Sequence, residues 1–212
     1  GPFTTAMPEL RSVYLRELQF PSGESLPIPP GVTHLKILGC TYDTPIAFPE
    51  GLDHLEYRQE SSEPGSVVPG PWPSDLDTLI MYGSDPYATA MIQTLLNAPL
   101  PAGLKDMQIE LLFSASEETI VIPDLPTELA TLDLSYARFI LPEVLPASLR
   151  SLRMHDHYDH IEQEPACLPF LPLGLEELDL YYNSGDGPEC LPNMPLGIAA
   201  ELGWMPVCTS RN

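Results

Sequence analysis

One spacing of proline and apolar residues recurs along this chain of 212 residues. Each copy has a proline, two residues, an apolar residue, two residues, a second apolar residue, one residue and a third apolar residue. The first complete copy consists of Pro29, Val32, Leu35 and Ile37. The prolines that begin the later copies are Pro49, Pro73, Pro101, Pro126, Pro146 and Pro172.

An earlier copy stands near the start of the chain, with its apolar residues at Leu10, Val13 and Leu15 and its proline displaced to Pro8. Successive prolines of the complete copies are 20, 24, 28, 25, 20 and 26 residues apart. Eight copies at such intervals indicate an internal repeat, and each repeat is expected to form the same small structural unit.

A repeat of this kind predicts a solenoid. The apolar residues of one copy form an edge that one repeat alone cannot bury, whereas stacked neighbours bury it. The part of each copy with alternating apolar residues is expected to form a short strand, and the strands to form a parallel sheet. The 26 prolines disfavour long helices and suit extended, polyproline-like return segments.

The interval of 28 residues holds a local exception. Asp85 is a suitable N-cap and Pro86 suits the first helical position. A helix of about three turns is therefore expected over residues 87–97, on the convex back of the solenoid. Its apolar side is expected to contain Ala90, Met91 and Leu95.

The sequence divides into three parts by this reasoning. We assign residues 1–6 to a tag remnant or disordered segment, residues 7–198 to a repeat domain of eight to nine repeats, and residues 199–212 to a C-terminal cap and tail. A solenoid needs a cover over its last apolar layer. The residues expected to form this cap are Ile198, Leu202 and Trp204.

Residues 168–183, Leu-Pro-Phe-Leu-Pro-Leu-Gly-Leu-Glu-Glu-Leu-Asp-Leu-Tyr-Tyr-Asn, carry two prolines per copy, and residues 122–134 follow the same form. This form resembles the bacterial, effector-type class of leucine-rich repeats with the motif Leu-Pro-x-Leu-Pro. The resemblance implies a leucine-rich repeat solenoid with short parallel strands on a concave face and a mostly irregular convex side with one or few short helices. Proteins of that class include secreted virulence effectors whose repeats select substrates for an attached ubiquitin ligase domain.

Two features depart from that class. The repeats here are longer and less regular, and the asparagine that usually follows the strand is present only at Asn183. Residues 28–35 and 41–46 are also similar to a second class, the FNIP repeats of amoebae and giant viruses, named for the motif Phe-Asn-Ile-Pro.

Charge and composition restrict the partners. The formal net charge is −21, which disfavours nucleic acid and anionic membrane surfaces. No apolar run reaches the roughly 18 residues of a membrane span, and the N-terminus lacks the features of a signal peptide. Four cysteines without a Cys-x-x-Cys pair favour an intracellular protein, or one secreted into a host cytoplasm. We expect a monomer.

The residues that flank the last two apolar positions of each copy are expected to form three columns on the concave face. These columns contain four of the nine basic residues of the chain in 24 of its 212 positions, together with three tyrosines. Tyrosine and arginine are favoured interface anchors. The sequence predicts a protein-binding face, basic at its N-terminal end and acidic in its middle. Its candidate contact residues are Tyr14, Arg16, Lys36, Arg58, Tyr82, Gln108, Asp133, Arg153, His155 and Tyr181.

Residues 155–160, His-Asp-His-Tyr-Asp-His, match the His-x-His-x-Asp-His string of metallo-β-lactamase-like hydrolases. That family needs further histidine ligands downstream, and none follows His160. We therefore predict no metal site and no cofactor, and keep His155, His157 and His160 only as weak ligand candidates. Cys167 and Cys190 occupy equivalent repeat positions and are expected to stack as buried thiols, with a disulfide as the alternative.

The expected function is protein binding through the concave face, without catalysis. The alternative is the substrate-recognition part of a secreted bacterial effector or ubiquitin ligase whose catalytic domain lies elsewhere. A metal-dependent hydrolase is a remote third hypothesis. No phosphate-binding glycine loop or Gly-x-Ser-x-Gly motif supports an enzyme.

Overall fold

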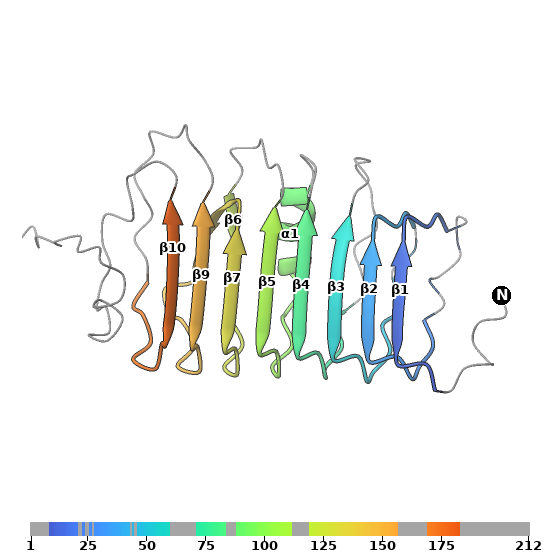
Figure 1. Cartoon of the computed structure of the whole chain (residues 1–212), viewed down its shortest axis with the longest axis horizontal. Coiled ribbons are helices and arrows are strands. Elements are labelled where there is room, and N and C mark those ends of the chain that lie inside the picture. The colour runs from blue at the N-terminus through green and yellow to red at the C-terminus, as the bar shows by residue number, and fades with distance from the viewer. Residues whose placement is uncertain are drawn as a thin grey trace, which may run out of the picture.

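The computed structural model describes residues 9–20, 23, 26, 28–42, 44, 46–59, 71–83, 88–111, 119–156 and 169–182. Eight parallel strands form one sheet in which neighbours along the chain are neighbours in space, so the described chain is a solenoid (Figure 1). The only strands of the described chain that interrupt this succession, β6 and β8, pair with each other. The strands of the sheet are β1 (Ser12–Arg16), β2 (His34–Leu38), β3 (His54–Gln59), β4 (Thr78–Gly83), β5 (Asp106–Leu111), β7 (Thr131–Ser135), β9 (Ser151–Asp156) and β10 (Glu177–Tyr182).

The repeated proline begins a tight turn before each strand from β2 to β10. The carbonyl of Pro49, for example, accepts a hydrogen bond from the backbone N–H of Leu52 at 3.2 Å. Proline lacks an N–H but keeps this acceptor, so it can occupy the first position of the turn without loss. The same bond joins Pro29 to Val32, Pro73 to Leu76, Pro101 to Leu104, Pro126 to Leu129, Pro146 to Leu149 and Pro172 to Leu175.

A second repeated contact joins each turn to the preceding repeat. The carbonyl of Thr33 accepts hydrogen bonds from the N–H groups of both Asp53 and His54, at 2.9 and 3.0 Å. One acceptor thereby satisfies two donors at the point where the strand begins. This arrangement fixes the register between repeats. It recurs at the carbonyls of Arg11, Asp53, Asp77, Lys105, Ala130 and Arg150.

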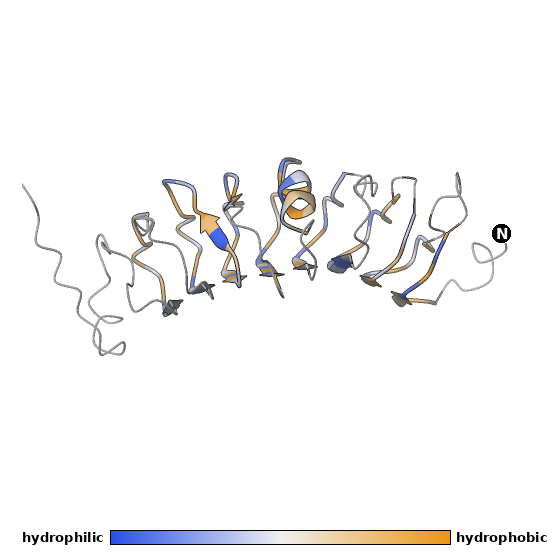
Figure 2. Cartoon of the chain, turned by 90° about the horizontal axis from the view of Figure 1, so that it is seen from above, coloured by the Kyte–Doolittle hydropathy of each residue, from blue (hydrophilic) through white to orange (hydrophobic). Residues whose placement is uncertain are grey.

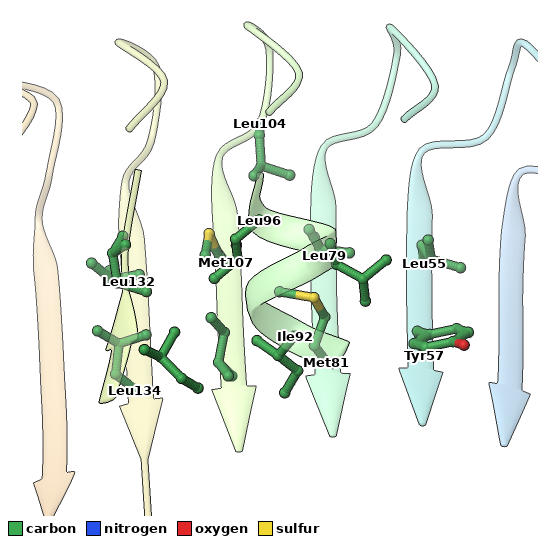
Figure 3. Packing of buried hydrophobic residues seen from close by; sticks show 14 of the residues in the cluster. Leu55, Tyr57, Leu79, Met81, Ile92, Leu96, Leu104, Met107, Leu132 and Leu134 are labelled. Carbon is green, nitrogen blue, oxygen red and sulfur yellow. The ribbon is translucent and has the colours of Figure 1, made fainter. Parts of the chain in front are cut away.

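The apolar positions of the repeat form a continuous core, as the spacing predicts. In β4, Leu79 and Met81 are fully buried, and the corresponding residues of the neighbouring strands lie beside them (Figure 3). The positions in the outermost described layers are only partly buried, because fewer described neighbours cover them. These partly buried residues are Leu10, Val13, Leu15 and Leu180.

The return segments lie on the other side of the core from the sheet (Figure 2). They hold one helix in the described part of the chain, α1 (Ala88–Leu96), close to the predicted bounds. It packs against β4 and β6. The predicted apolar side of this helix is partly wrong, because Ala90 is exposed and Met91 only partly buried, whereas Leu95 is buried. The buried side consists of Ala88, Thr89, Ile92, Leu95 and Leu96.

Two return segments also pair as strands, which the sequence analysis did not predict. β6 (Thr119–Val121) and β8 (Arg138–Ile140) form a two-stranded parallel sheet. The side-chain amide of Gln93 in α1 donates to the carbonyl of Val121 at 3.2 Å and accepts from its N–H at 2.7 Å. Helix α1 therefore completes the hydrogen bonds at the outer edge of β6.

Several predictions concern residues outside the described ranges. These are the N-terminal segment 1–6, the cap at residues 199–212, the helix-starting Asp85 and Pro86, the histidines His157 and His160, and the pair Cys167 and Cys190. Of the four cysteines, Cys40 is described. It is buried, and its thiol donates to the carbonyl of Leu38 at 3.6 Å.

Candidate binding surface

The side chains that alternate with the core residues form the opposite face of the sheet, which we call the open face. Strands β4 and β5 alternate buried and half-buried side chains along their length. Strand pairing aligns the residues of the open face in three columns, in the predicted register. The first column is Ser12, His34, His54, Thr78, Asp106, Thr131, Ser151 and Glu177. The second is Tyr14, Lys36, Glu56, Ile80, Gln108, Asp133, Arg153 and Asp179. The third is Arg16, Leu38, Arg58, Tyr82, Glu110, Ser135, His155 and Tyr181.

At the N-terminal end of the open face, Lys36 has two neighbours. Its ammonium group lies 2.5 Å from a carboxylate oxygen of Glu56 and 5.7 Å from the centre of the Tyr14 ring. The ring face attracts the cation, so Tyr14 and Lys36 support each other's position. Arg16 pairs with Glu17, the residue after β1, at 2.8 Å. Both pairs lower the net positive charge of this end.

Two histidines stack in the first column. The rings of His34 and His54 are 5.6 Å apart at an angle of 21°. Burial, followed by the proximity of His34, lowers the pKa of His54 below its usual value of 6.5. His34 also lies 3.5 Å from a carboxylate oxygen of Asp53. A stacked pair favours neutral imidazoles, because protonating both rings would place two like charges side by side.

The middle of the open face combines Arg58, Tyr82 and Glu110, which follow one another in the third column. All three are half-buried. Burial raises the pKa of the Tyr82 phenol, and the carboxylates of Glu56 and Glu110 raise it further. Burial likewise raises the pKa of Glu110, with a further contribution from Asp133, whereas Arg58 opposes the rise.

Arg153 occupies the centre of a carboxylate cluster near the C-terminal end of the open face. Its guanidinium nitrogens lie 3.3 Å from Asp133, 3.2 Å from Asp179 and 3.5 Å from Glu177. These contacts join β9 to both of its neighbours, β7 and β10. One cation facing three carboxylates leaves this region negatively charged.

His155 contacts the same cluster. Its Nε2 lies 3.0 Å from Oδ2 of Asp179, and its ring packs edge-on against Tyr181 at 5.8 Å. His155 is therefore engaged by strand β10, while the other two weak ligand candidates lie outside the described residues. Within the described ranges, no three histidine, cysteine or carboxylate side chains are grouped so that they could hold a metal ion.

The structure brings some predicted contact residues together and separates others. Tyr14 lies beside Lys36, Asp133 beside Arg153, and His155 beside Tyr181. Gln108 lies between Ile80 and Asp133 in its column. Arg16 and Arg58 lie in the third column on either side of Leu38.

The simple prediction of a basic end followed by an acidic middle needs refinement. Lys36 is paired with Glu56, and the acidic part extends through Glu177 and Asp179 to the last strand, with Arg153 inside it. The sequence analysis did not select Glu177 and Asp179, although the columns place both beside Arg153. Reading charges between adjacent columns and strands, and not along the chain, would have identified them.

Among the described residues, no helix is long and apolar enough to cross a membrane. The parallel strands, the register and the buried leucines together place the chain in the class of repeat solenoids and are consistent with a leucine-rich-repeat-like fold. No protein-family model matches the sequence, and no curated protein matches it.

Among solved structures, the chain is similar to one described as CroV588, a novel circular LRR protein. The TM-score is 0.34 and the sequence identity 16%. The match covers 83% of this chain and 34% of the other, so this chain spans about a third of the length of that protein. The fold assignment given above depends on the strand pairing of this chain.

Proposed function

We propose that this solenoid is a protein-interaction scaffold whose partner binds the open face. The observation that carries the proposal is the content of that face: 24 aligned side chains that the core does not use, with tyrosines, arginines and carboxylates in adjacent columns. Tyr14 and Tyr181, near its two ends, are 54% and 52% exposed. Exposed tyrosine is costly in water and is common at interfaces.

The shape of the sheet supports the same face. In Figure 2 the row of strands follows the inner side of a gentle arc, with the return segments outside it. We propose that the open face is the concave surface, which can surround a convex partner. The return side differs, because α1 and the β6–β8 sheet use much of their apolar surface to cover the core.

The test compares a variant of the open face with a variant of another surface. Tyr82→Ala combined with Arg58→Ala removes two candidate anchors, each worth about 2 kcal/mol or more if it is a hot spot. We expect the dissociation constant of the partner to rise by about thirtyfold or more. The matched control is Val144→Ser combined with Leu173→Ser, two apolar residues outside the sheet that are 79% and 92% exposed.

The partner would first be captured with photo-crosslinking groups placed at Tyr14 and, separately, at Val144. Binding is then measured for the wild type and both double variants, and circular dichroism checks that each remains folded. Loss of binding in the open-face variant alone supports the proposal. Equal affinity of that variant and the wild type, or equal loss in the control, would refute it.

A second candidate is that this scaffold selects substrates for a catalytic domain, as the Leu-Pro-x-Leu-Pro resemblance implies. The paired prolines of residues 168–175 favour it. The reading frame of the full gene discriminates the two, because an adjoining catalytic domain would support substrate selection. A reading frame without one would leave the scaffold to act alone.

A further inference from the structure

The open face divides into two halves of different chemistry. The N-terminal half, on β1 to β4, holds three cations and one carboxylate among its twelve column residues, and the C-terminal half, on β5, β7, β9 and β10, holds one cation and five carboxylates. The formal charges are therefore +2 and −4. Counting Glu17, which pairs with Arg16, reduces the first value to +1. Five formal charges still separate the halves.

Apolar side chains divide in the same direction. The N-terminal half carries Tyr14, Leu38, Ile80 and Tyr82, whereas Tyr181 alone represents the large apolar and aromatic residues in the columns of the other half. The remaining uncharged residues of the C-terminal half are small or polar apart from His155. Two independent properties, charge and apolar content, thus change at the boundary between β4 and β5.

Local pairing does not remove this difference. Lys36 and Glu56 neutralise each other within the N-terminal half. In the C-terminal half, Arg153 is shared by three carboxylates, and Asp106 and Glu110 add two more charges. The raised pKa of Glu110 agrees with this excess, because Asp133 is one of its causes. A ligand cation would relieve the repulsion among these carboxylates.

We propose that the open face binds an extended polypeptide segment of opposite polarity, with an apolar and acidic end over β1 to β4 and a basic end over β5 to β10. The segment runs across the strands, because charge changes from strand to strand and much less along each strand. Eight strands spaced about 4.8 Å apart span about 34 Å, which is roughly ten residues of extended chain. This inference rests on the proposed function and specifies the chemistry of its partner.

The net charge of −21 alone would attract any cationic peptide, so the experiment must hold composition constant. The probes are synthetic peptides of about ten residues. Two contain a block of glutamate with leucine and tyrosine and a block of lysine with serine, in both block orders. A third contains the same residues with the charges alternating. An all-lysine peptide of the same length completes the set.

We expect at least one block peptide to bind with a dissociation constant about tenfold or more below that of the alternating peptide, as several exposed charge contacts allow. Crosslinking groups at the two ends of the bound peptide should react separately, the acidic end with β1 to β4 and the basic end with β9 and β10. Raising the salt concentration should weaken binding.

Substitutions then test the assignment of each half. Arg58→Glu and Glu110→Lys together should abolish the preference for block order, whereas Asp124→Lys, an exposed residue outside the sheet, should preserve it. Equal binding of block and alternating peptides would overturn the inference. So would all-lysine binding as tight as block binding, or self-association of the chain that buries the open face in sedimentation experiments.

Failure here and failure of the proposed function are distinguishable. If the captured partner is lost in the Tyr82 and Arg58 double variant while all peptides bind alike, the open face binds protein but does not select by polarity. If that variant retains its partner, the open face itself is wrong.

Discussion

Gly83 gives a direct test of how helix α1 sits on the sheet. It is the last residue of β4, pairs with Leu111 of β5, and is buried. A Cβ added here would collide with the Cβ of Ala88, which begins α1, and with Cδ2 of Leu111. Leu111 can rotate to a limited extent, but the Ala88 Cβ is fixed to the helix backbone. Gly83→Ala therefore requires α1 and β4 to separate.

Gly174→Ala is the matched control. There the added Cβ would meet the guanidinium end of Arg150, which is half-exposed and flexible. Turning that side chain away breaks its hydrogen bond of 2.6 Å to the Gly174 carbonyl, a surface contact worth about 1 kcal/mol or less. Neither glycine has a positive φ, so both alanines reduce the entropy of the unfolded chain similarly. The difference between the variants isolates the packing cost at Gly83.

Overpacking in a buried site costs about 1 to 3 kcal/mol, and we expect the free energy of unfolding of Gly83→Ala to lie below that of Gly174→Ala by this amount. Urea unfolding followed by circular dichroism, and in parallel by tryptophan fluorescence, measures the difference and tests whether the transitions coincide. Adding Leu111→Ala should recover part of the loss, visible as a favourable coupling energy. Two glycine variants equal within about 0.5 kcal/mol would refute the packing of α1 against β4.

Three further predictions concern other parts of the described chain. Leu79→Ala, in the middle of the core, should lower the free energy of unfolding in urea by about 2 to 5 kcal/mol; a loss below about 1 kcal/mol would contradict a continuous core. The hydroxyls of Tyr42 and Tyr57 lie 2.6 Å apart; burial raises the pKa of Tyr57 to about 12 and that of Tyr42 further, so their contribution to stability is present below pH 10 and lost as the pH rises above it. Phenolate absorbance should show these two tyrosines ionising last, together with unfolding, and Tyr42→Phe should reduce that late signal. Glu110 has a raised pKa, which costs stability at neutral pH that is regained as the pH falls; Glu110→Gln should be the more stable protein at pH 7, and a gap in urea midpoint that persists at acid pH would exclude this cause.

The repeat in the sequence was sufficient to predict the strands, their order and their register. Each copy fixes its strand twice, through the turn begun by proline and through the alternating apolar residues that must face the core. A shift of one residue would bury His54 and Glu56 and expose Leu55 and Tyr57. Seven aligned copies repeat that penalty, so the columns of the open face followed from the sequence with no information on contacts.

The return segments were harder to predict because no periodic pattern defines them. Helix α1 was located by its N-terminal signals, but its buried side depends on where β4 and β6 lie, and Ala90 was therefore assigned wrongly. The β6–β8 pair forms because two extended segments from successive turns lie side by side with free backbone groups. Its edge partner, Gln93, is 28 residues from Val121 in the sequence.

The ion pairs of the open face help to separate its structural role from a binding role. Exposed pairs such as Lys36 with Glu56 contribute about 0.2 to 1 kcal/mol each, less than one buried leucine in the core. The three contacts of Arg153 are also at a half-exposed site and together remain a modest contribution to stability. The core therefore determines the fold largely without these residues, which leaves the columns open to variation at little cost in stability. Their more important effect is to hold long side chains in fixed positions, because an Arg153 already oriented by three carboxylates loses less entropy when a partner binds beside it.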